Sequence, residues 1–190
     1  MSQKDAPLKD EKEIARSGDA KARFYAEALE QSAKFREDYP TRLVNVVKAA
    51  DMPWEDAPDG RIKHLVHEKM NTVECCMEIY MQFIPPGEAT GKHRHLAEEV
   101  FYVVEGEGYD LHWDVKFDCE EEFIWDWESE PRRYEWKTGD FVYIPPYSVH
   151  QHFNGDPNNE ARIIVMSNRI LREMGFGWFE QLENAKSYKG

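Results

Sequence analysis

The chain has 190 residues, a formal net charge of −13 and a calculated pI of about 5.0. This length allows one domain to bury a sizeable core without disulfides. So acidic a surface repels phosphate backbones and anionic lipid heads, which excludes nucleic acid and membrane surfaces as favoured partners; a small anionic substrate stays compatible if a buried metal outweighs the distant surface charge.

The first 20 residues contain no apolar run of the kind that a signal peptide has. No other segment approaches the roughly 20 apolar residues needed to span a bilayer. An odd number of cysteines without a C-x-x-C pair argues against both a disulfide framework and a thiolate zinc site. We therefore expect a protein of the reducing cytoplasm. The three cysteines are Cys75, Cys76 and Cys119.

Residues 8–38 are charged and rich in alanine, and they are predicted to form a helix with Asp19 as its N-cap and Pro40 as its stop. A modest apolar stripe on this helix indicates an arm that packs on the following domain or on a second subunit. Residues 51–60, DMPWEDAPDG, are expected to be a proline-rich link. Residues 1–60 are thus predicted to be a helical arm and linker.

From residue 61 to residue 168, short runs rich in β-branched and aromatic residues alternate with Gly, Pro, Asn and Asp. Many short strands separated by turns predict an all-β sandwich or barrel over 61–168. The acidic, tryptophan-rich segment 118–131 lengthens one connection, and Trp125 and Trp127 could cover one edge of the barrel. Residues 169–190 are predicted to be a helical tail, interrupted at GFG, residues 175–177.

The first candidate site lies in GEATGKHRHLAEEVFYVVEG, residues 87–106. His93 and His95 would project from the same face of a strand, because side chains alternate with a period of two, so both can bind one ion. After a tight turn at Leu96–Glu98 the chain can return antiparallel and bring Glu99 beside the two histidines. The neighbouring Glu98 would then face the opposite way.

The second candidate site lies in GDFVYIPPYSVHQHFN, residues 139–154. Pro145 and Pro146 make a turn that sets up a strand carrying His150, with His152 on the same face. The remaining histidines are interpreted as hydrogen-bonded core residues. They are His64, His67 and His112.

These two segments resemble the two signature motifs of the cupin superfamily. The first motif, G-x5-H-x-H-x3-E-x6-G, is matched at every position; in the second, G-x5-P-x-G-x2-H-x3-N, Tyr147 stands at the usual glycine. The resemblance covers residues 61–168 and implies a double-stranded β-helix, or jelly-roll, barrel with an N-terminal helical arm and a short C-terminal helix. It further implies a homodimer, because cupins commonly dimerise and edge strands need covering. The metal ligands that it implies are His93, His95, Glu99 and His150.

Three imidazoles and a carboxylate suit Fe(II), Mn(II), Co(II), Ni(II), Cu(II) or Zn(II). We favour Fe(II), because open positions on an iron with N and O ligands are what dioxygen chemistry uses. The sequence around both motifs is also similar to that of the gentisate 1,2-dioxygenase group, which are ring-cleaving iron enzymes that act on hydroxylated aromatic acids. Those proteins have no glutamate at the position of Glu99. The leading hypothesis is a non-haem dioxygenase that cleaves a carbon–carbon bond in a small hydroxylated, preferably aromatic, substrate.

Two alternatives stay open. In the first, the chain is a metal-dependent lyase, isomerase or decarboxylase that uses the metal as a Lewis acid. In the second, it is a non-catalytic ligand-binding or sensing cupin, because a fold alone does not give a function. His152 is the best candidate for an acid or base beside the metal, and Tyr80 and Gln82 are further candidates.

Overall fold

The computed structural model of the protein describes residues 23–42, 46–67, 70, 77–118 and 124–190. The chain divides into two compact units, residues 1–43 and residues 44–190. Among the described residues, no helix combines the length and the apolar character needed to cross a membrane. The three cysteines and Asp19, the predicted N-cap, lie outside the described residues.

In the first unit the described element is helix α2, Phe24–Arg42. The expected stop at Pro40 is wrong, because the helix continues for two residues beyond it. Proline lacks a backbone N–H and therefore removes one hydrogen bond to the preceding turn. Because only two helical residues follow Pro40, the helix tolerates the loss of this one hydrogen bond.

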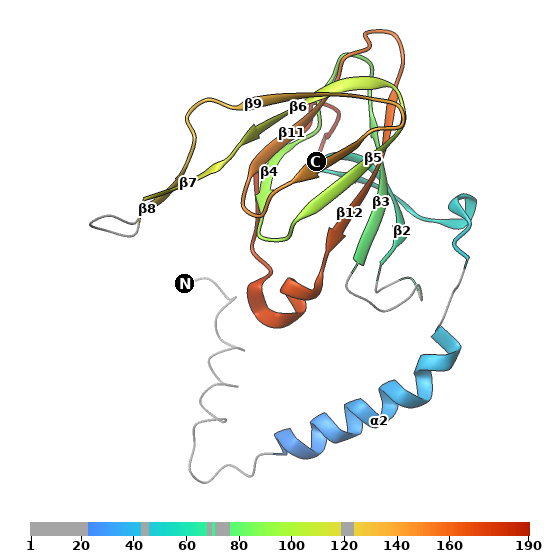
Figure 1. Cartoon of the computed structure of the whole chain (residues 1–190). Helices are drawn as coiled ribbons and strands as arrows, with labels where there is room; N and C mark the ends of the chain where they lie inside the picture. Colours follow the sequence, from blue (N-terminus) through green and yellow to red (C-terminus); the bar gives the residue numbers. More distant parts are fainter. Residues whose placement is uncertain (1–22, 43–45, 68–69, 71–76, 119–123) are drawn as a thin grey trace. The chain divides into compact units, whose positions relative to one another are not determined.

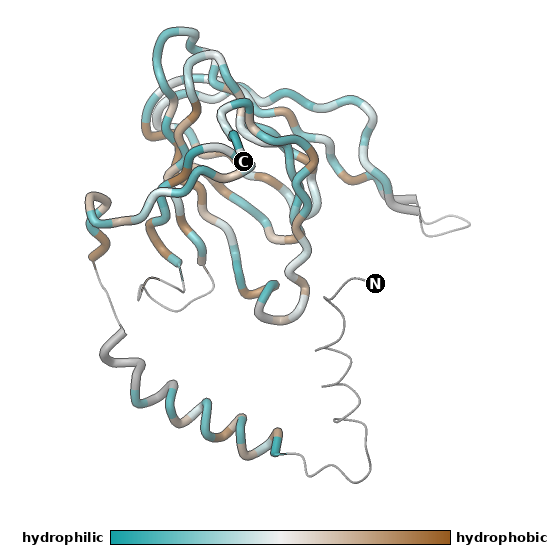
Figure 2. Tube along the Cα trace, turned by 180° about the vertical axis from the view of Figure 1, so that it is seen from behind, coloured by the Kyte–Doolittle hydropathy of each residue, from teal (hydrophilic) through white to brown (hydrophobic). Residues whose placement is uncertain are grey.

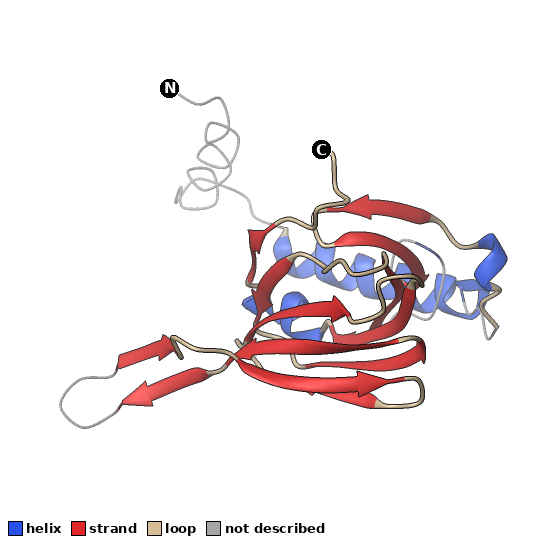
Figure 3. Cartoon of the chain, turned by 90° about the horizontal axis from the view of Figure 1, so that it is seen from above, coloured by secondary structure: helices blue, strands red, loops and turns tan. Residues whose placement is uncertain are grey.

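The second unit is built of antiparallel strands in two main sheets, as Figures 1 and 3 show. A six-stranded sheet has the order β1-β2-β3-β12-β5-β10, and a five-stranded sheet has the order β13-β4-β11-β6-β9. The elements are η1 (Ala49–Asp51), β1 (Trp54–Ala57), β2 (Gly60–Val66), β3 (Met77–Ile84), β4 (Lys92–His95), β5 (Glu99–Glu105), β6 (Glu107–Trp113), β7 (Val115–Asp118), β8 (Ile124–Trp127), β9 (Arg132–Lys137), β10 (Phe141–Ile144), β11 (Val149–Asn154), β12 (Ala161–Asn168), η3 (Arg172–Phe176) and β13 (Phe179–Glu183).

Strands extend beyond both ends of the range predicted for the barrel. The expected linker 51–60 contains β1, which pairs with β2 through a tight hairpin. The expected helical tail contains the short helix η3, but it then forms β13, which pairs with β4. Neither segment has a strong strand pattern of its own, so each forms a strand only because it pairs with a neighbouring strand of the barrel.

The acidic segment after β6 forms a separate hairpin, β7–β8, that projects from the barrel (Figures 1 and 3). The Trp127 indole N–H donates to the Tyr147 carbonyl at 2.8 Å, and the Arg94 guanidinium lies 3.6 Å from the centre of the Trp127 ring. Trp127 therefore covers the turn of the second motif. The side chain of Trp125 is outside the described part of the structure.

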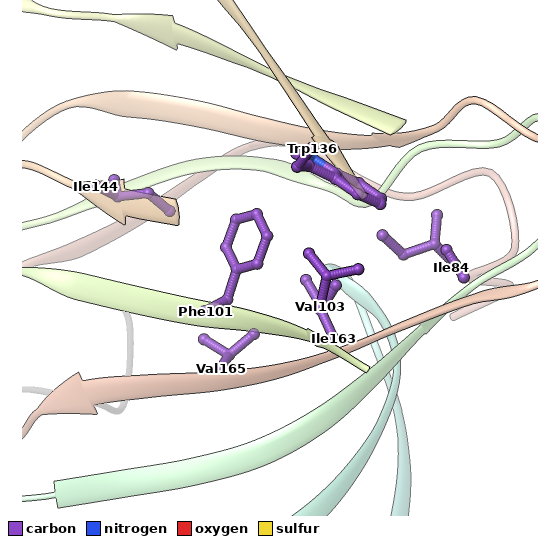
Figure 4. Close-up of a cluster of buried hydrophobic side chains, with 8 residues drawn as sticks. Ile84, Phe101, Val103, Trp136, Ile144, Ile163 and Val165 are labelled. Carbon is purple, nitrogen blue, oxygen red and sulfur yellow. The ribbon is translucent and has the colours of Figure 1, made fainter. Parts of the chain in front are cut away.

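The apolar core lies between the two sheets (Figure 4). Figure 2 shows hydrophobic stretches among hydrophilic ones along the barrel strands, and the more and less buried positions alternate along β5 and β6, as expected for strands with one buried face. On β5 the buried positions are Glu99, Phe101 and Val103, so the candidate carboxylate shares a face with the core. The core residues are Ile84, Phe101, Val103, Trp136, Ile144, Ala161, Ile163 and Val165.

Two motif glycines stand where the chain passes between the sheets. Gly106 joins β5 to β6 with φ 102°, and Gly139 joins β9 to β10 with φ 95°. A Cβ added at Gly106 would lie 2.8 Å from the Cβ of Ala161, whereas the space around Gly139 is open to 4 Å among the described atoms. Only Gly106 thus combines a left-handed backbone with a close contact.

We expect Gly106→Ala to destabilise the fold more than Gly139→Ala. Both substitutions place a Cβ on a left-handed backbone, at a cost of about 1–2 kcal/mol. Gly106→Ala adds a clash with the buried Ala161, which brings a further loss of about 1–3 kcal/mol. Guanidinium unfolding of the two variants measures the difference in the free energy of unfolding. Equal losses of stability would show that the contact with Ala161 adds nothing to the cost of the substitution.

Candidate metal centre

Three of the predicted ligands come from the five-stranded sheet. His93 and His95 lie on β4 and His150 lies on β11, and the Cα atoms of His93 and His150 are directly opposite each other. The expected antiparallel return after His95 is wrong in one respect, since β5 belongs to the other sheet. Glu99 therefore reaches the histidines from across the barrel. This crossing is possible because Leu96–Glu98 forms an irregular turn that extends neither strand.

The four side chains converge inside the barrel. One donor atom from each of His93, His95, Glu99 and His150 lies within 4.8 Å of the others. His150 is fully buried, His93 and Glu99 are 2% exposed, and the His95 side chain is 11% exposed. Glu98, in contrast, is exposed. The geometry thus distinguishes the two adjacent glutamates, as the sequence predicted.

Backbone carbonyls set the orientation of two imidazoles. Nδ1 of His95 donates to the Ala97 carbonyl at 2.7 Å, and Nδ1 of His150 donates to the Ser148 carbonyl at 2.9 Å. Each ring therefore directs its Nε2 towards Glu99, at 3.3 Å from Oε2 for His95 and 3.9 Å from Oε1 for His150. This is the arrangement that fixes the tautomer of metal-binding histidines.

Several of these atoms are buried polar groups. Within the described part of the chain, Nε2 of His95, Nε2 of His150 and Oε1 of Glu99 are buried without a partner of hydrogen-bond geometry. Buried polar atoms are nearly always satisfied, because leaving one unpaired is costly. A cation among them would satisfy all three at once. The residues therefore fit a divalent metal.

The charges of the group also suit a cation. Burial and the neighbouring His93 lower the pKa of His150 well below its usual value, so its imidazole is neutral, as a metal ligand must be. Burial opposes ionisation of Glu99, but the neighbouring imidazole of His95 outweighs this and lowers the pKa of the carboxyl. Glu99 is thus a carboxylate at neutral pH, available as an anionic donor.

Asp59 supports the third histidine. Its Oδ1 lies 3.1 Å from Nδ1 of His93, and its Oδ2 accepts a hydrogen bond from Nε2 of Gln82 at 2.6 Å. Gln82, predicted as a catalytic candidate, is fully buried, and through this hydrogen bond it holds Asp59 in place. Asp59 itself was missed by the sequence reasoning, because it lies in the β1–β2 turn, far from both motifs.

Asp59→Asn is expected to lower the affinity of the chain for a divalent metal by about 10–100-fold, since a carboxylate that orients a metal-binding histidine typically contributes this much. Competition with a chelator of known Zn²⁺ affinity measures the change. Asp56→Asn, at an exposed position of the same hairpin, is the matched control and should leave the affinity unchanged. An unaltered affinity in Asp59→Asn would remove the supporting role of this carboxylate.

A second buried carboxylate, Asp110, lies behind the group. Its Oδ2 is 2.8 Å from Nδ1 of His152 and 3.2 Å from Nε2 of His112, and its Oδ1 accepts from the Trp136 indole at 2.8 Å. Although burial opposes it, the charge of Asp110 raises the pKa of His152 to about 9. His152 is therefore cationic at neutral pH, and its Nε2 lies 3.7 Å from Oε1 of Glu99.

Of the three histidines predicted to be hydrogen-bonded core residues, His112 is buried, whereas His64 and His67 are only partly buried. His112 is buried beside Asp110, and Nε2 of His64 lies 2.6 Å from a Glu55 carboxylate oxygen. Nε2 of His67 lies 3.9 Å from Oε1 of Glu78. Asp110, which no motif marks, is the residue on this side that sequence reasoning missed.

A pocket of about 310 Å³ opens beside the candidate ligands. His93, His95 and Glu99 form part of its wall, together with Tyr80, another of the catalytic candidates. Burial, and then the charge of Glu99, raise the pKa of the Tyr80 phenol well above its usual value, so it keeps its proton and can donate a hydrogen bond. His152 and Gln82 are not among the residues that line the pocket.

Strand β13 supplies an apolar cover for the histidines. Phe179 pairs in register with His95, and its ring is nearly parallel to that of His95, with centroids 6.2 Å apart. The Phe179 ring also lies 5.4 Å from that of His93. The segment expected to be a helical tail thus completes the wall of the pocket.

Comparison with known proteins agrees with this fold. The family described as auxin binding protein matches residues 41–174. A cupin-like protein from Thermotoga maritima is 21% identical over 73% of this chain and 84% of that chain, with a TM-score of 0.46. Bacillus subtilis oxalate decarboxylase, a protein with Mn(II) centres, is 12% identical over 70% of this chain and 31% of that chain, with a TM-score of 0.52. A DMSP lyase from Ruegeria pomeroyi is 18% identical over 74% of this chain and 64% of that chain, with a TM-score of 0.47.

The chain spans about a third of the length of the oxalate decarboxylase. At these identities the likeness concerns the fold, and together with the family match it confirms the predicted all-β cupin barrel.

Proposed function

The chain belongs to the auxin-binding-protein family of cupins, and from this premise we propose that it is a non-haem iron dioxygenase acting on a small hydroxylated aromatic compound. One observation carries the proposal: four buried donor atoms lie within 4.8 Å of one another, and three of the four residues form part of the wall of a pocket that is also lined by aromatic side chains. His93, His95, Glu99 and His150 would hold the metal.

The donor set is compatible with several divalent metals. Fe(II) is proposed first, because an iron with three imidazole ligands and one carboxylate keeps positions free for dioxygen chemistry. Mn(II) is the nearest alternative, since the oxalate decarboxylase of similar fold has Mn(II) centres. Local similarity of the motifs to the gentisate 1,2-dioxygenase group supports a hydroxylated aromatic substrate, although Glu99 has no counterpart there.

The side chains in the pocket and behind it have different tasks in this proposal. Tyr80 keeps its phenolic proton and would donate a hydrogen bond to a substrate oxygen. Phe179 lies over two of the ligating rings and would exclude water from them. His152 is buried behind Glu99, with its Nε2 3.7 Å from Oε1, and would hold that carboxylate in place, so it acts as a positioning residue instead of contacting the substrate.

A lyase or decarboxylase is the second candidate, and the position of Tyr80 favours it. A protonated phenol beside the Glu99 carboxylate in one pocket could deliver a proton to a substrate carbon or oxygen without any oxidant. The third candidate is a non-catalytic binder, which the description of the family as auxin binding proteins supports. The three differ in what they require of dioxygen and in whether turnover occurs.

Oxygen uptake by iron-reconstituted protein, measured with a panel of phenolic acids and an auxin, tests the proposal. A dioxygenase consumes one dioxygen for each substrate lost and stops when dioxygen is removed. Turnover that continues anaerobically would contradict the dioxygenase and favour the lyase. Saturable binding with no product in either atmosphere would contradict both enzymatic candidates.

A further inference from the structure

The outer face of the six-stranded sheet is apolar, although the outer face of an antiparallel sheet is usually polar. One row of residues in register crosses all six strands, and it consists of Phe141, Tyr102, Ile164, Met81, Lys63 and Trp54. The row beside it consists of Tyr143, Val100, Met166 and Ile79. Lys63 is the one charged residue in these two rows.

The side chains of both rows point away from the core. On β5 and β12 they alternate with residues such as Phe101 and Ile163, which are fully buried between the sheets. Nearer the edges of the sheet, Phe141, Tyr143 and Trp54 are 68%, 53% and 46% exposed. A contiguous apolar surface of this kind on a protein marks a site of interaction.

Charged side chains flank the apolar rows in a pattern that can pair with itself. On β2, the cationic groups of Arg61 and Lys63 lie 4.2 Å and 4.8 Å from the centre of the Trp54 ring. On β5, the exposed Glu105 carboxylate lies 3.2 Å from Nη1 of Arg162. Strands β2 and β5 are each second from an edge of the sheet, at opposite sides of its middle. The cations of β2 and the carboxylate of β5 are therefore placed symmetrically about the centre of the face.

We propose that this face binds a second copy of the chain, in a two-fold symmetric dimer whose six-stranded sheets pack face to face. Sheets that pack in this way keep their strands within about 30° of parallel. A two-fold axis along the strands, between β3 and β12, places β2 of one copy on β5 of the other. Arg61 then meets Glu105 of the second copy, and Lys63 meets the ring of Tyr102 of the second copy. Apolar side chains of β3 and β12 form the centre of the interface.

The charge of the chain favours this face over the rest of the surface. With a net charge of −13, two copies repel each other wherever carboxylates meet. The two apolar rows contain no carboxylate, so the repulsion is smallest there, and the burial of apolar area is most favourable. The face and the candidate ligand Glu99 lie on opposite sides of β5, so the interface does not depend on metal binding or on the proposed function.

Sedimentation velocity of the full chain across a range of protein concentrations tests the interface, and the wild-type protein should sediment as a dimer. Arg61→Glu should raise the dissociation constant of the dimer by about tenfold or more, because it places a carboxylate opposite Glu105 of the second copy. Combining Arg61→Glu with Glu105→Arg should restore the wild-type constant to within about threefold. Arg133→Glu is the matched control and should change nothing, since Arg133 is also an exposed arginine over an aromatic ring but lies on β9 of the other sheet.

Ile164→Glu is the second variant, because it places a charge at the centre of the interface; it should raise the dissociation constant by about a hundredfold or more. Circular dichroism checks its folding, and the exposed charge reversals decide if it does not fold. A wild-type chain that is monomeric at every concentration would overturn the proposal, whatever else then covers the face. A dimer that Arg61→Glu and Arg133→Glu weaken equally, or that a folded Ile164→Glu leaves intact, would overturn it as well. A double variant that does not recover would contradict the pairing of β2 with β5.

Discussion

His150→Ala is expected to reduce bound metal from about one ion per chain to less than about a tenth after dialysis against a weak chelator. The imidazole of His150 is fully buried and kept neutral, and its Nε2 points at the carboxylate of Glu99. Removing it leaves three of the four donors, so the metal affinity falls by more than the loss of an orienting contact would cause. Elemental analysis of the purified variant gives the metal content.

His64→Ala is the matched control, because it also removes an imidazole from a barrel strand but lies outside the group of four. It should retain about the metal content of the wild-type protein. A His150→Ala variant that is folded and fully occupied would contradict the ligand assignment.

Asp110→Asn is expected to destabilise the metal-free fold by about 3–5 kcal/mol, the usual result of removing one partner from a buried ion pair. Asp110 is fully buried and accepts hydrogen bonds from His112, His152 and Trp136. Its loss would leave the charge of His152 in the barrel without its closest counter-ion. Guanidinium unfolding measures the loss, and Glu107→Gln, at an exposed position of the same strand, should change stability by less than about 0.5 kcal/mol.

The pH dependence of stability provides a separate test of this pair. The pKa of His152 is raised from 6.5 to about 9, so its contribution to stability is complete below 6.5 and is lost as the pH rises through 9. In the chelator-treated protein the free energy of unfolding should therefore fall across this interval by up to about 3 kcal/mol. In Asp110→Asn the fall should be much smaller; an equal fall in both proteins would place its origin elsewhere.

Much of the barrel was predictable because its strands have local patterns. The spacing of His93 and His95, and of His150 and His152, places each pair on one face of a strand whatever the rest of the chain does. The second motif also predicts the backbone at Tyr147. This residue stands where the motif has glycine, and it adopts the left-handed conformation that glycine favours, with φ 64°.

The remaining features depend on partners far away in the chain. Strand β13 is stabilised by pairing with β4, about 85 residues earlier in the sequence, and its own residues carry no clear strand pattern. Asp59 lies in an ordinary turn and becomes important only because β1 and β2 carry that turn to His93. Asp110 looks like any polar strand residue until the fold buries it beside His152. The homodimer expected from the resemblance stays a prediction.

The most direct test of the metal centre is anomalous diffraction at the zinc edge from crystals of protein loaded with Zn²⁺. The proposal predicts one strong peak inside the barrel, about 2.0–2.2 Å from a nitrogen of each of His93, His95 and His150 and from an oxygen of Glu99. Crystals in which the barrel gives no peak, or in which zinc binds only to surface carboxylates, would contradict it.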